Sequence, residues 1–454
     1  MTQPTSTALP DIRRSDFPTD FLWGCSTSSY QIEGAVHEGG RGESIWDRFC
    51  ATPGTIRDGS SGAVACDHYH RWPEDLDIAR GLGANAYRFS IAWPRIFPQG
   101  RGAAPNAAGL DFYSRLVDGM LERGLQPWAT LYHWDLPQAL QDQGGWTNRD
   151  TVGHFVAFAD VVSRTLGDRV QHWITHNEPW CTAMMGYGDG VHAPGLRDFR
   201  AALQACHHVL LSHGLAVPAI RAAVPDARVG ITLSLHPISA ATASAEDAAA
   251  ALRHDGLRNR WFLDPLHGRG YPADVLDLLG HRAPHMQARD AAAIATPTDF
   301  LGINYYFPEV VENAPGEGPI ATRVVEQHGV PRTAFGWPVS PEGMVTLLER
   351  VQRDYAPPVV YLTENGSTYD DVVLPDGSIH DVERRAYLAR HIAAAREAVA
   401  RGVPLKGYFA WSLLDNFEWA EGYIRRFGLT HVDYATQKRT LKASGHWYRG
   451  FLRG

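Results

Sequence analysis

The chain has 454 residues, of which 44% are hydrophobic and 20% charged, and its formal net charge is -8. These values are typical of a globular protein with a large core, and the acidic balance gives no reason to expect nucleic acid as a partner. No apolar run reaches the roughly 18 residues that a membrane span needs, so we expect no membrane partner. Five cysteines, an odd number without a Cys-x-x-Cys pair, argue against a disulfide framework or structural zinc.

The N-terminal segment, residues 1–20, is polar and contains several prolines and charges. It lacks the apolar stretch of a secretory signal, so we expect a soluble cytoplasmic protein. We assign residues 1–16 to an N-terminal tail and residues 17–454 to one domain. The sequence does not decide between a monomer and a homo-oligomer.

Eight short apolar runs predict β-strands, and most are apolar almost throughout, as expected for strands buried on both faces of a parallel sheet. They span residues 21–27, 85–91, 126–132, 170–176, 228–236, 299–306, 358–363 and 405–413. Helical patterns alternate with them over residues 109–123, 147–166, 198–224, 341–353 and 381–401. This alternation, without an internal linker, predicts an α/β fold formed by a single-domain (β/α)8 TIM barrel.

Long loops are expected after several strands, at the C-terminal face of the barrel where such folds bind their ligands. Residues 311–337, with scattered glycine and proline, are predicted to be a long loop after the sixth strand. Two strands end directly in an acid, at Glu178 within Asn-Glu-Pro and at Glu364 within Glu-Asn-Gly. Two carboxylates suit glycoside hydrolysis, which needs a proton donor and a second carboxylate facing an oxocarbenium-like centre.

The main alternative is a barrel metal hydrolase, because the chain contains His68-x-His70. That pair leads into a predicted helix rather than ending a strand, and His207, His208 and His213 lack the i,i+4 spacing of a helical metal pair. The sequence also contains no glycine-rich phosphate loop and no G-x-S-x-G motif. We therefore expect neither a metal nor another cofactor.

Extended motifs throughout the chain support the carbohydrate interpretation. They lie at residues 21–34, 40–47, 87–96, 133–137, 144–146, 177–179, 304–306, 363–366 and 411–419. With these motifs the chain resembles glycoside hydrolase family 1, the β-glucosidase family, from about residue 17 to residue 447. One departure is His176, where many members have phenylalanine before Asn-Glu-Pro, and it puts no catalytic role in doubt.

The resemblance implies a retaining β-glucosidase that releases terminal non-reducing β-D-glucosyl residues through a covalent glycosyl-enzyme. By motif, Glu178 is the acid/base and Glu364 the nucleophile, while Arg88 keeps Glu364 ionised and Tyr306 donates a hydrogen bond to it. The resemblance assigns substrate binding to Gln31, His133, Trp134, Asn177, Asn304, Tyr306, Trp337, Trp411, Glu418, Trp419 and Phe427. Members that act on phosphorylated sugars replace the acid found here at Glu418, so unphosphorylated sugars are expected.

The implied partners are small β-glycosides and short β-linked oligosaccharides, as in cellulose and other polysaccharide degradation. A broad β-glycosidase or transglycosidase acting on β-galactosides or β-fucosides would use the same two acids and remains an alternative. A sugar-binding protein without catalysis is disfavoured because both acids are present.

Overall fold

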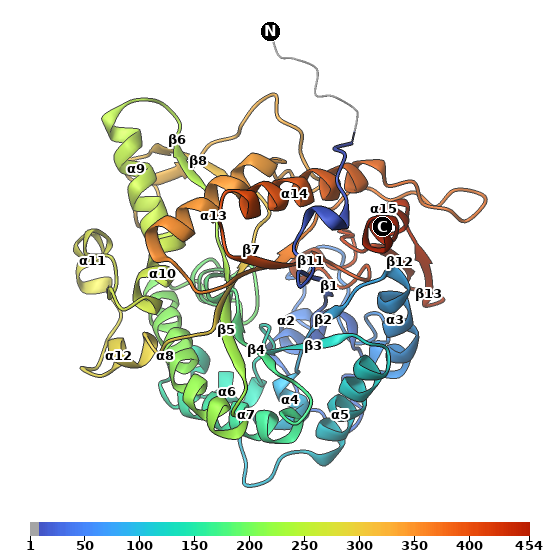
Figure 1. The fold of residues 1–454 in the computed structure, drawn as a ribbon. Helices are drawn as coiled ribbons and strands as arrows, with labels where there is room; N and C mark the ends of the chain where they lie inside the picture. Colours follow the sequence, from blue (N-terminus) through green and yellow to red (C-terminus); the bar gives the residue numbers. More distant parts are fainter. Residues whose placement is uncertain (1–8) are drawn as a thin grey trace.

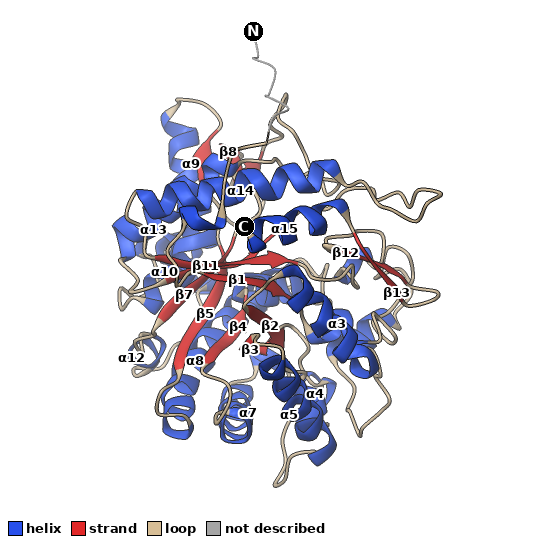
Figure 2. Ribbon diagram, turned by 45° about the vertical axis from the view of Figure 1, so that its right-hand side comes forward, coloured by secondary structure: helices blue, strands red, loops and turns tan. Residues whose placement is uncertain are grey.

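The computed structural model describes residues 9–454, and its centre is a closed barrel of eight parallel strands surrounded by helices (Figures 1 and 2). The barrel strands are β1 (Leu22–Ser26), β2 (Ala86–Ser90), β3 (Gln126–Tyr132), β4 (His172–Asn177), β5 (Arg228–Ser234), β7 (Phe300–Asn304), β10 (Val360–Asn365) and β11 (Leu405–Trp411). They follow one another around the barrel in chain order, and β11 pairs with β1 to close it. The predicted TIM barrel is confirmed, and each predicted run coincides with a strand apart from terminal residues.

Helices cover the outside of the barrel. They are α1 (Ser29–Ile32), α2 (Ile45–Cys50), α3 (His68–Leu82), α4 (Trp93–Ile96), α5 (Ala107–Glu122), α6 (Gln138–Gln141), α7 (Asp150–Leu166), α8 (Phe199–Ala223), α9 (Ala245–Asp255), α10 (Trp261–Leu266), α11 (Ala273–Leu279), α12 (Asp290–Ile294), α13 (Pro341–Tyr355), α14 (Val382–Ala400) and α15 (Ala443–Arg453). The five predicted helices correspond to α5, α7, α8, α13 and α14. None of the helices within residues 9–454 has the length and apolarity that a membrane crossing requires.

Short helical segments of other types complete the connections. The π-helical ones are η3 (Cys181–Gly188) and η4 (Gly256–Arg260), and the 3-10 turns are η1 (Arg14–Asp16), η2 (Gly145–Thr147), η5 (Gly280–Arg282) and η6 (Trp419–Glu421). Both π-helical segments follow barrel strands that reach the C-terminal face, one after β4 and one after β5. Such segments are frequent at functional sites.

The predicted loop over residues 311–337 is wrong in part. β8 (Glu309–Asn313) and β9 (Thr322–Val324) form a small sheet with β6 (Ile238–Ala240), which comes from the preceding connection. β8 pairs with β6 in parallel and with β9 in antiparallel fashion. These strands are short and only partly buried, so they lack the apolar run that is typical of a barrel strand. In addition, β6 and β8 pair although they are far apart in the sequence. A second small sheet joins β12 (Thr430–Asp433) to β13 (Lys438–Leu441).

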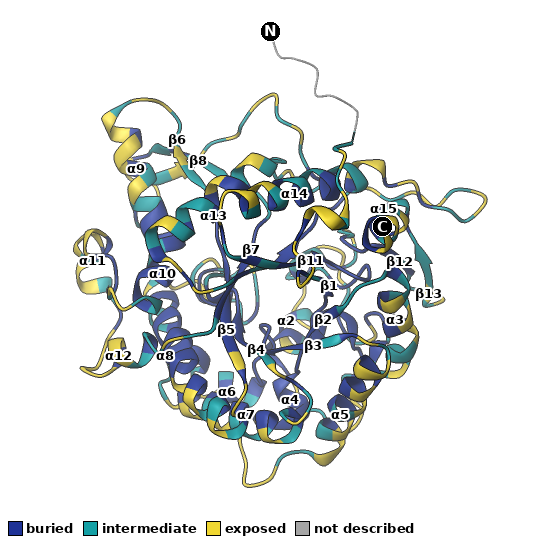
Figure 3. Ribbon diagram, in the orientation of Figure 1, coloured by how far each residue is buried: buried dark blue, intermediate teal, exposed yellow. Residues whose placement is uncertain are grey.

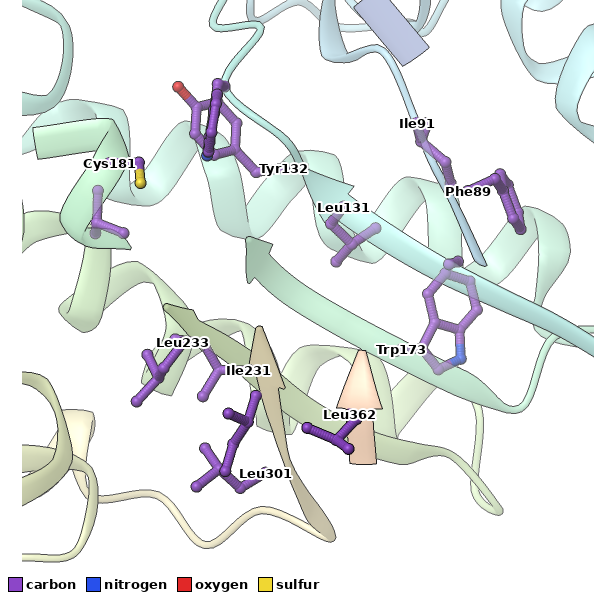
Figure 4. Close-up of a cluster of buried hydrophobic side chains, with 14 of the residues drawn as sticks. Phe89, Ile91, Leu131, Tyr132, Trp173, Cys181, Ile231, Leu233, Leu301 and Leu362 are labelled. Carbon is purple, nitrogen blue, oxygen red and sulfur yellow. The ribbon is translucent and has the colours of Figure 1, made fainter. Parts of the chain in front are cut away.

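Apolar side chains fill both sides of the barrel wall, which is the most buried part of the molecule (Figure 3). Outside, residues such as Leu131, Ile231 and Leu301 project from the strands into the main core (Figure 4). Inside, Trp128 packs against Phe300 and Phe409 with ring centroids 5.4 and 5.1 Å away. This inner cluster lies at the N-terminal half of the strands, which leaves the C-terminal half of the interior to polar side chains.

The N-terminal segment meets the C-terminal helix where the structure describes it. Arg14 donates a hydrogen bond of 2.8 Å from Nη1 to the carbonyl oxygen of Leu452 in α15. Residues 1–8 of the predicted tail lie outside the described residues, and the proposed boundary at residue 16 stays a prediction.

Candidate active site

Glu364 occupies the end of β10, where the strand register against β7 shifts between Leu362 and Glu364. An irregularity of this kind redirects a side chain and is frequent beside active sites. The carboxylate accepts a hydrogen bond at each oxygen, one from Arg88 Nη1 at 2.6 Å and one from Tyr306 Oη at 2.7 Å. Because Arg88 is fully buried, its ion pair with Glu364 forms away from solvent.

Glu178 follows the last residue of β4 and has a left-handed backbone conformation, with φ of 47°. A non-glycine residue in this conformation costs about 1–3 kcal/mol, and such strain is concentrated at functional sites. Its Oε1 accepts a hydrogen bond from Asn304 Nδ2 at 2.8 Å, and its Oε2 accepts one from the Cys181 thiol at 3.1 Å. The donors to Glu178 are therefore neutral groups.

A continuous hydrogen-bond network joins the two acids. Asn177 Oδ1 accepts from Arg88 Nη2 at 2.6 Å and from Asn304 Nδ2 at 3.0 Å. The network thus runs from Glu364 through Arg88, Asn177 and Asn304 to Glu178, and every member is buried. This places both carboxyl groups in fixed positions at the top of the barrel.

Burial raises the pKa of Glu364 to about 7; the Arg88 guanidinium opposes this effect, and the nearby Glu178 carboxylate adds to it. The hydrogen bond from Tyr306 also lowers this pKa, so Arg88 and Tyr306 together favour the ionised form of Glu364 against the effect of burial.

Both acids open into one pocket of about 400 Å³ at the C-terminal face. This volume is within the usual range for small-molecule sites. The predicted site residues that line it are His133, Trp134, Glu178, Tyr306, Trp337, Glu364, Trp411, Glu418, Trp419 and Phe427. Most of the predicted set therefore lines one cavity, although its members come from distant parts of the chain.

The other four predicted residues, Gln31, Arg88, Asn177 and Asn304, lie behind the pocket wall and hold its members in place. Gln31 Nε2 donates to the carbonyl oxygen of Phe417 at 2.9 Å and to Glu418 Oε2 at 3.3 Å. Their direct contact with a sugar stays a prediction. Their positioning role follows from these hydrogen bonds.

Glu418 contributes a third buried carboxyl group to the pocket. Burial raises its pKa well above the ordinary value, the charges of Glu364 and Glu178 raise it further, and the hydrogen bond from Gln31 opposes them. Next to it, Trp419 has a positive φ of 52° and its ring lies 4.6 Å from that of Trp134. The acid is thereby held beside a broad aromatic surface.

A second aromatic cluster, around Trp337, also lines the pocket. Trp337 stacks on Phe335 with centroids 4.5 Å apart and an interplanar angle of 6°, and on Phe307 at 4.8 Å. Aromatic rings in the pocket lining suit a ligand with flat apolar faces and polar edges, such as a sugar ring.

Thirteen pocket residues were not in the predicted set: Trp180, Cys181, Met185, Val191, His192, Ser234, His236, Arg258, Phe307, Glu309, Phe335, Ala420 and Glu421. The sequence indicated some of them, since Trp180 and Cys181 lie two and three residues after Glu178 and His236 ends the fifth predicted run. The sequence did not indicate Arg258 in η4, because nothing in a connection of this length shows which of its residues face the C-terminal ends of the strands.

The histidines of the metal alternative have other partners. His68 begins α3 and its Nδ1 lies 2.8 Å from Asp75 Oδ2, while His70 contacts Asp67 and Glu38. Over residues 9–454 we find no group of three or more His, Cys, Asp or Glu side chains arranged to hold a metal ion.

His176 lies away from the pocket. Its Nε2 is 2.8 Å from Ser212 Oγ, and its ring stacks on Phe155 with centroids 4.3 Å apart. Since neither contact involves the two acids, the departure at this position affects packing against α7 and α8 rather than the site.

A parallel barrel with two buried glutamates facing one aromatic pocket defines the class of (β/α)8 carbohydrate hydrolases. Comparison with known proteins gives the family: residues 13–453 match the model of glycosyl hydrolase family 1. The chain belongs to this family and is a glycosidase, as its motifs predicted.

Similar proteins match over nearly their whole length. Beta-glucosidase A of Thermotoga maritima is 48% identical over 96% of this chain and 98% of its own. The 1,4-beta-D-glucan glucohydrolase of Thermotoga neapolitana is 46% identical over the same shares. The crystal structure of the Thermotoga maritima beta-glucosidase in complex with glucoimidazole has a TM-score of 0.93 and 47% identity, covering 96% of this chain and 98% of that one.

Proposed function

We propose that this protein is a retaining β-glucosidase that hydrolyses terminal non-reducing β-D-glucosyl residues, with Glu364 as nucleophile and Glu178 as acid/base. The observation that carries the assignment is the difference between the donors to the two acids. Glu364 receives a guanidinium and a phenol, whereas Glu178 receives an amide and a thiol. Because a cationic donor favours the charged form of a carboxyl group, we assign Glu364 as the nucleophile and Glu178 as the proton donor.

The reaction follows from this distribution of charge. Glu178 gives its proton to the glycosidic oxygen while Glu364 attacks the anomeric carbon, forming a glycosyl ester and releasing the aglycone. Esterification removes the negative charge of Glu364, so Glu178, now ionised, can take a proton from water. The water oxygen then bonds to the anomeric carbon, and Glu364 leaves as a carboxylate.

Three observations support glucose as the sugar. The two similar proteins described above carry the names beta-glucosidase and 1,4-beta-D-glucan glucohydrolase. Glu418 lines the pocket and provides a carboxyl group for sugar hydroxyls, while Gln31 fixes its orientation. The pocket volume suits a terminal sugar with a short aglycone, so we propose small β-glycosides and short oligosaccharides from cellulose as substrates. A cytoplasmic location, where such small sugars would be hydrolysed, is part of the proposal.

The assignment of the two acids is tested by replacing Glu364 with glycine. We expect turnover to be lost and to return when azide or formate fills the vacated space, giving a product of α configuration. Glu178→Ala is the matched variant: it should impair substrates with poor leaving groups much more than activated aryl glucosides. Equal losses on both substrate types would contradict Glu178 as the acid.

The alternative, a broad β-glycosidase or transglycosidase that accepts β-galactosides or β-fucosides, uses the same chemistry. A panel of nitrophenyl glycosides gives the sugar preference, and product analysis with a competing alcohol gives the share of transfer. The β-glucoside proposal fails if another sugar has the higher kcat/KM.

A further inference from the structure

Arg258 is a buried cation in the pocket wall, with a relative exposure of 6%. Its Nη2 donates to Ser234 Oγ at 3.1 Å and to His236 Nε2 at 2.5 Å, and its guanidinium carbon lies 3.8 Å from the centre of the Trp180 ring. None of these three partners is an acid. Within the described part of the chain, its Nε and Nη1 have no hydrogen-bond partner.

A buried charge without a paired acid is costly, because the protein interior does not replace the hydration that the charge loses. The histidine beside Arg258 does not add a second charge, since burial and the Arg258 cation lower the pKa of His236 to about 3. Arg258 therefore presents two nitrogens without hydrogen-bond partners at a ligand pocket, and the carboxylate of Glu309 in the same wall interacts with its charge. Such a site suits an anionic group of the ligand.

Two further acids of the pocket wall, Glu309 and Glu421, have partners of their own. Glu309 Oε2 lies 3.0 Å from His254 Nε2, and its other oxygen is 3.7 Å from His236 Nδ1. Glu421, also in the pocket wall, pairs with Arg57 and Arg425. The charge of Arg258 lowers the pKa of Glu309, but neither its Nε nor its Nη1 donates a hydrogen bond to a described residue, so these two donors are left for the ligand.

Arg258 lies on the side of the pocket where the aglycone must leave. It covers Trp180, which is two residues beyond Glu178, and the next residue, Cys181, donates its thiol hydrogen bond to Glu178. Since Glu178 protonates the glycosidic oxygen in the proposed reaction, groups around it contact the aglycone rather than the glucosyl ring.

An aromatic surface begins next to the cation. The His236 ring meets Phe307 edge to face with centroids 4.4 Å apart, and Phe307 stacks on Trp337 at 4.8 Å. A flat ring resting on this surface can place a substituent beside Arg258. The surface therefore supplies stacking and the guanidinium supplies charge, at neighbouring positions.

We propose that the pocket favours β-glucosides whose aglycone is an aromatic ring carrying a carboxylate, which accepts a hydrogen bond from a free nitrogen of Arg258. This inference rests on the proposed β-glucosidase activity and specifies its aglycone. Phe307 and Trp337 carry the ring, and Arg258 selects the charge.

The test compares 4-carboxyphenyl β-D-glucoside with 4-carbamoylphenyl β-D-glucoside, which has the same ring and a neutral amide. The ratio of their kcat/KM values is measured for the wild-type enzyme and for Arg258→Met, so that differences in leaving-group reactivity cancel. A charge-assisted hydrogen bond corresponds to about tenfold or more, so the ratio should fall by at least that factor in the variant. Arg258→Lys, which keeps the charge, should retain part of the preference.

Arg228→Met is the matched control, because Arg228 begins β5 at the opposite end from Ser234 and its side chain is 66% exposed. It changes the net charge equally and should leave the ratio unaltered. An equal ratio in wild type and Arg258→Met overturns the proposal. So does an equal loss on both substrates and on 4-nitrophenyl β-D-glucoside, which would indicate a structural role, or a larger loss on cellobiose, which would indicate recognition of a neutral sugar.

A binding measurement separates this inference from the proposed activity. Calorimetry with 4-hydroxybenzoate and 4-hydroxybenzamide needs no turnover, and the acid should bind more tightly to wild type but not to Arg258→Met. If wild type fails to hydrolyse 4-nitrophenyl β-D-glucoside, the proposed function fails, while a binding preference would still support the carboxylate site. Absence of any binding preference overturns the site itself.

Discussion

Arg88, in β2, and Glu364, at the end of β10, form an ion pair of 2.6 Å inside the barrel, although 275 residues separate them in the chain. Both side chains are buried, so solvent screens their attraction little. The Arg88 charge opposes the burial that raises the pKa of Glu364 to about 7, and so favours the ionised form that the proposed nucleophile needs. The ion pair also links β2, which is next to β1, to β10, which lies beyond β11 on the other side of β1.

The stereochemistry of the reaction tests the nucleophile directly. If Glu364 attacks the anomeric carbon and water later displaces it, the configuration inverts twice and the first product is the β-anomer. Proton NMR during the first minutes of hydrolysis distinguishes this anomer before mutarotation. An initial α-anomer would exclude the double displacement.

The raised pKa of Glu364 predicts the acidic side of the pH profile. Burial raises this pKa to about 7, and the proposed nucleophile attacks only in its ionised form, so we expect kcat/KM of the wild-type enzyme to increase as pH rises through this region. Because the charge of Glu178 adds to the rise, Glu178→Gln should move the acidic limb to lower pH when the rate is measured on a dinitrophenyl glucoside. An unchanged limb in this variant would assign the titration to another group.

We expect the sugar selectivity of the enzyme to depend on Glu418. Its carboxyl group should accept hydrogen bonds from the O4 and O6 hydroxyls, each worth about 1.5–3 kcal/mol, or roughly 10- to 150-fold in rate when fully expressed in the transition state. Glu418→Ala should lower kcat/KM on β-glucosides by at least this range and impair 6-deoxy substrates less. Glu421→Ala is the control, because that acid pairs with Arg57 and Arg425 and should matter far less. Preference of the wild-type enzyme for 6-phosphoglucosides would refute this role.

Replacement of Lys442 is expected to cause a large loss of stability. Its Nζ lies 2.5 Å from Asp371 Oδ2 and 2.6 Å from Asp415 Oδ1, and all three side chains are buried. Removing one partner of a buried ion pair costs about 3–5 kcal/mol, so Lys442→Met should lower the free energy of unfolding markedly. Lys406→Met is the control, since Lys406 pairs with Asp20 at an exposed site where the loss should be under about 1 kcal/mol. Thermal unfolding at one scan rate compares them, and equal Tm values for both variants would contradict the prediction.

Much of the barrel could be predicted from local sequence. Strands such as β3 (Gln126–Tyr132) are apolar almost throughout, and helices such as α5 (Ala107–Glu122) repeat apolar residues at helical spacing, so periodicity alone indicates them. Because strand ends in a parallel barrel meet at one face, the acids at Glu178 and Glu364 could be expected in one site. The family motifs then gave expected roles for residues whose positions alone indicate no function, such as Gln31.

Other features were decided only by the tertiary structure. The small sheet of β6, β8 and β9 depends on hydrogen bonds between distant, mostly polar segments, which no local pattern records. The left-handed backbone of Glu178 is held by its surroundings, since the residue itself disfavours it. Arg258 faces the pocket because a π-helical turn after β5 directs it beside His236 and Trp180. The sequence by itself determined the barrel and the two acids, because apolar periodicity and strand ends are local properties. Which charged and aromatic side chains surround those acids was decided by packing between segments that are remote in the sequence. Such contacts form only when the chain has folded.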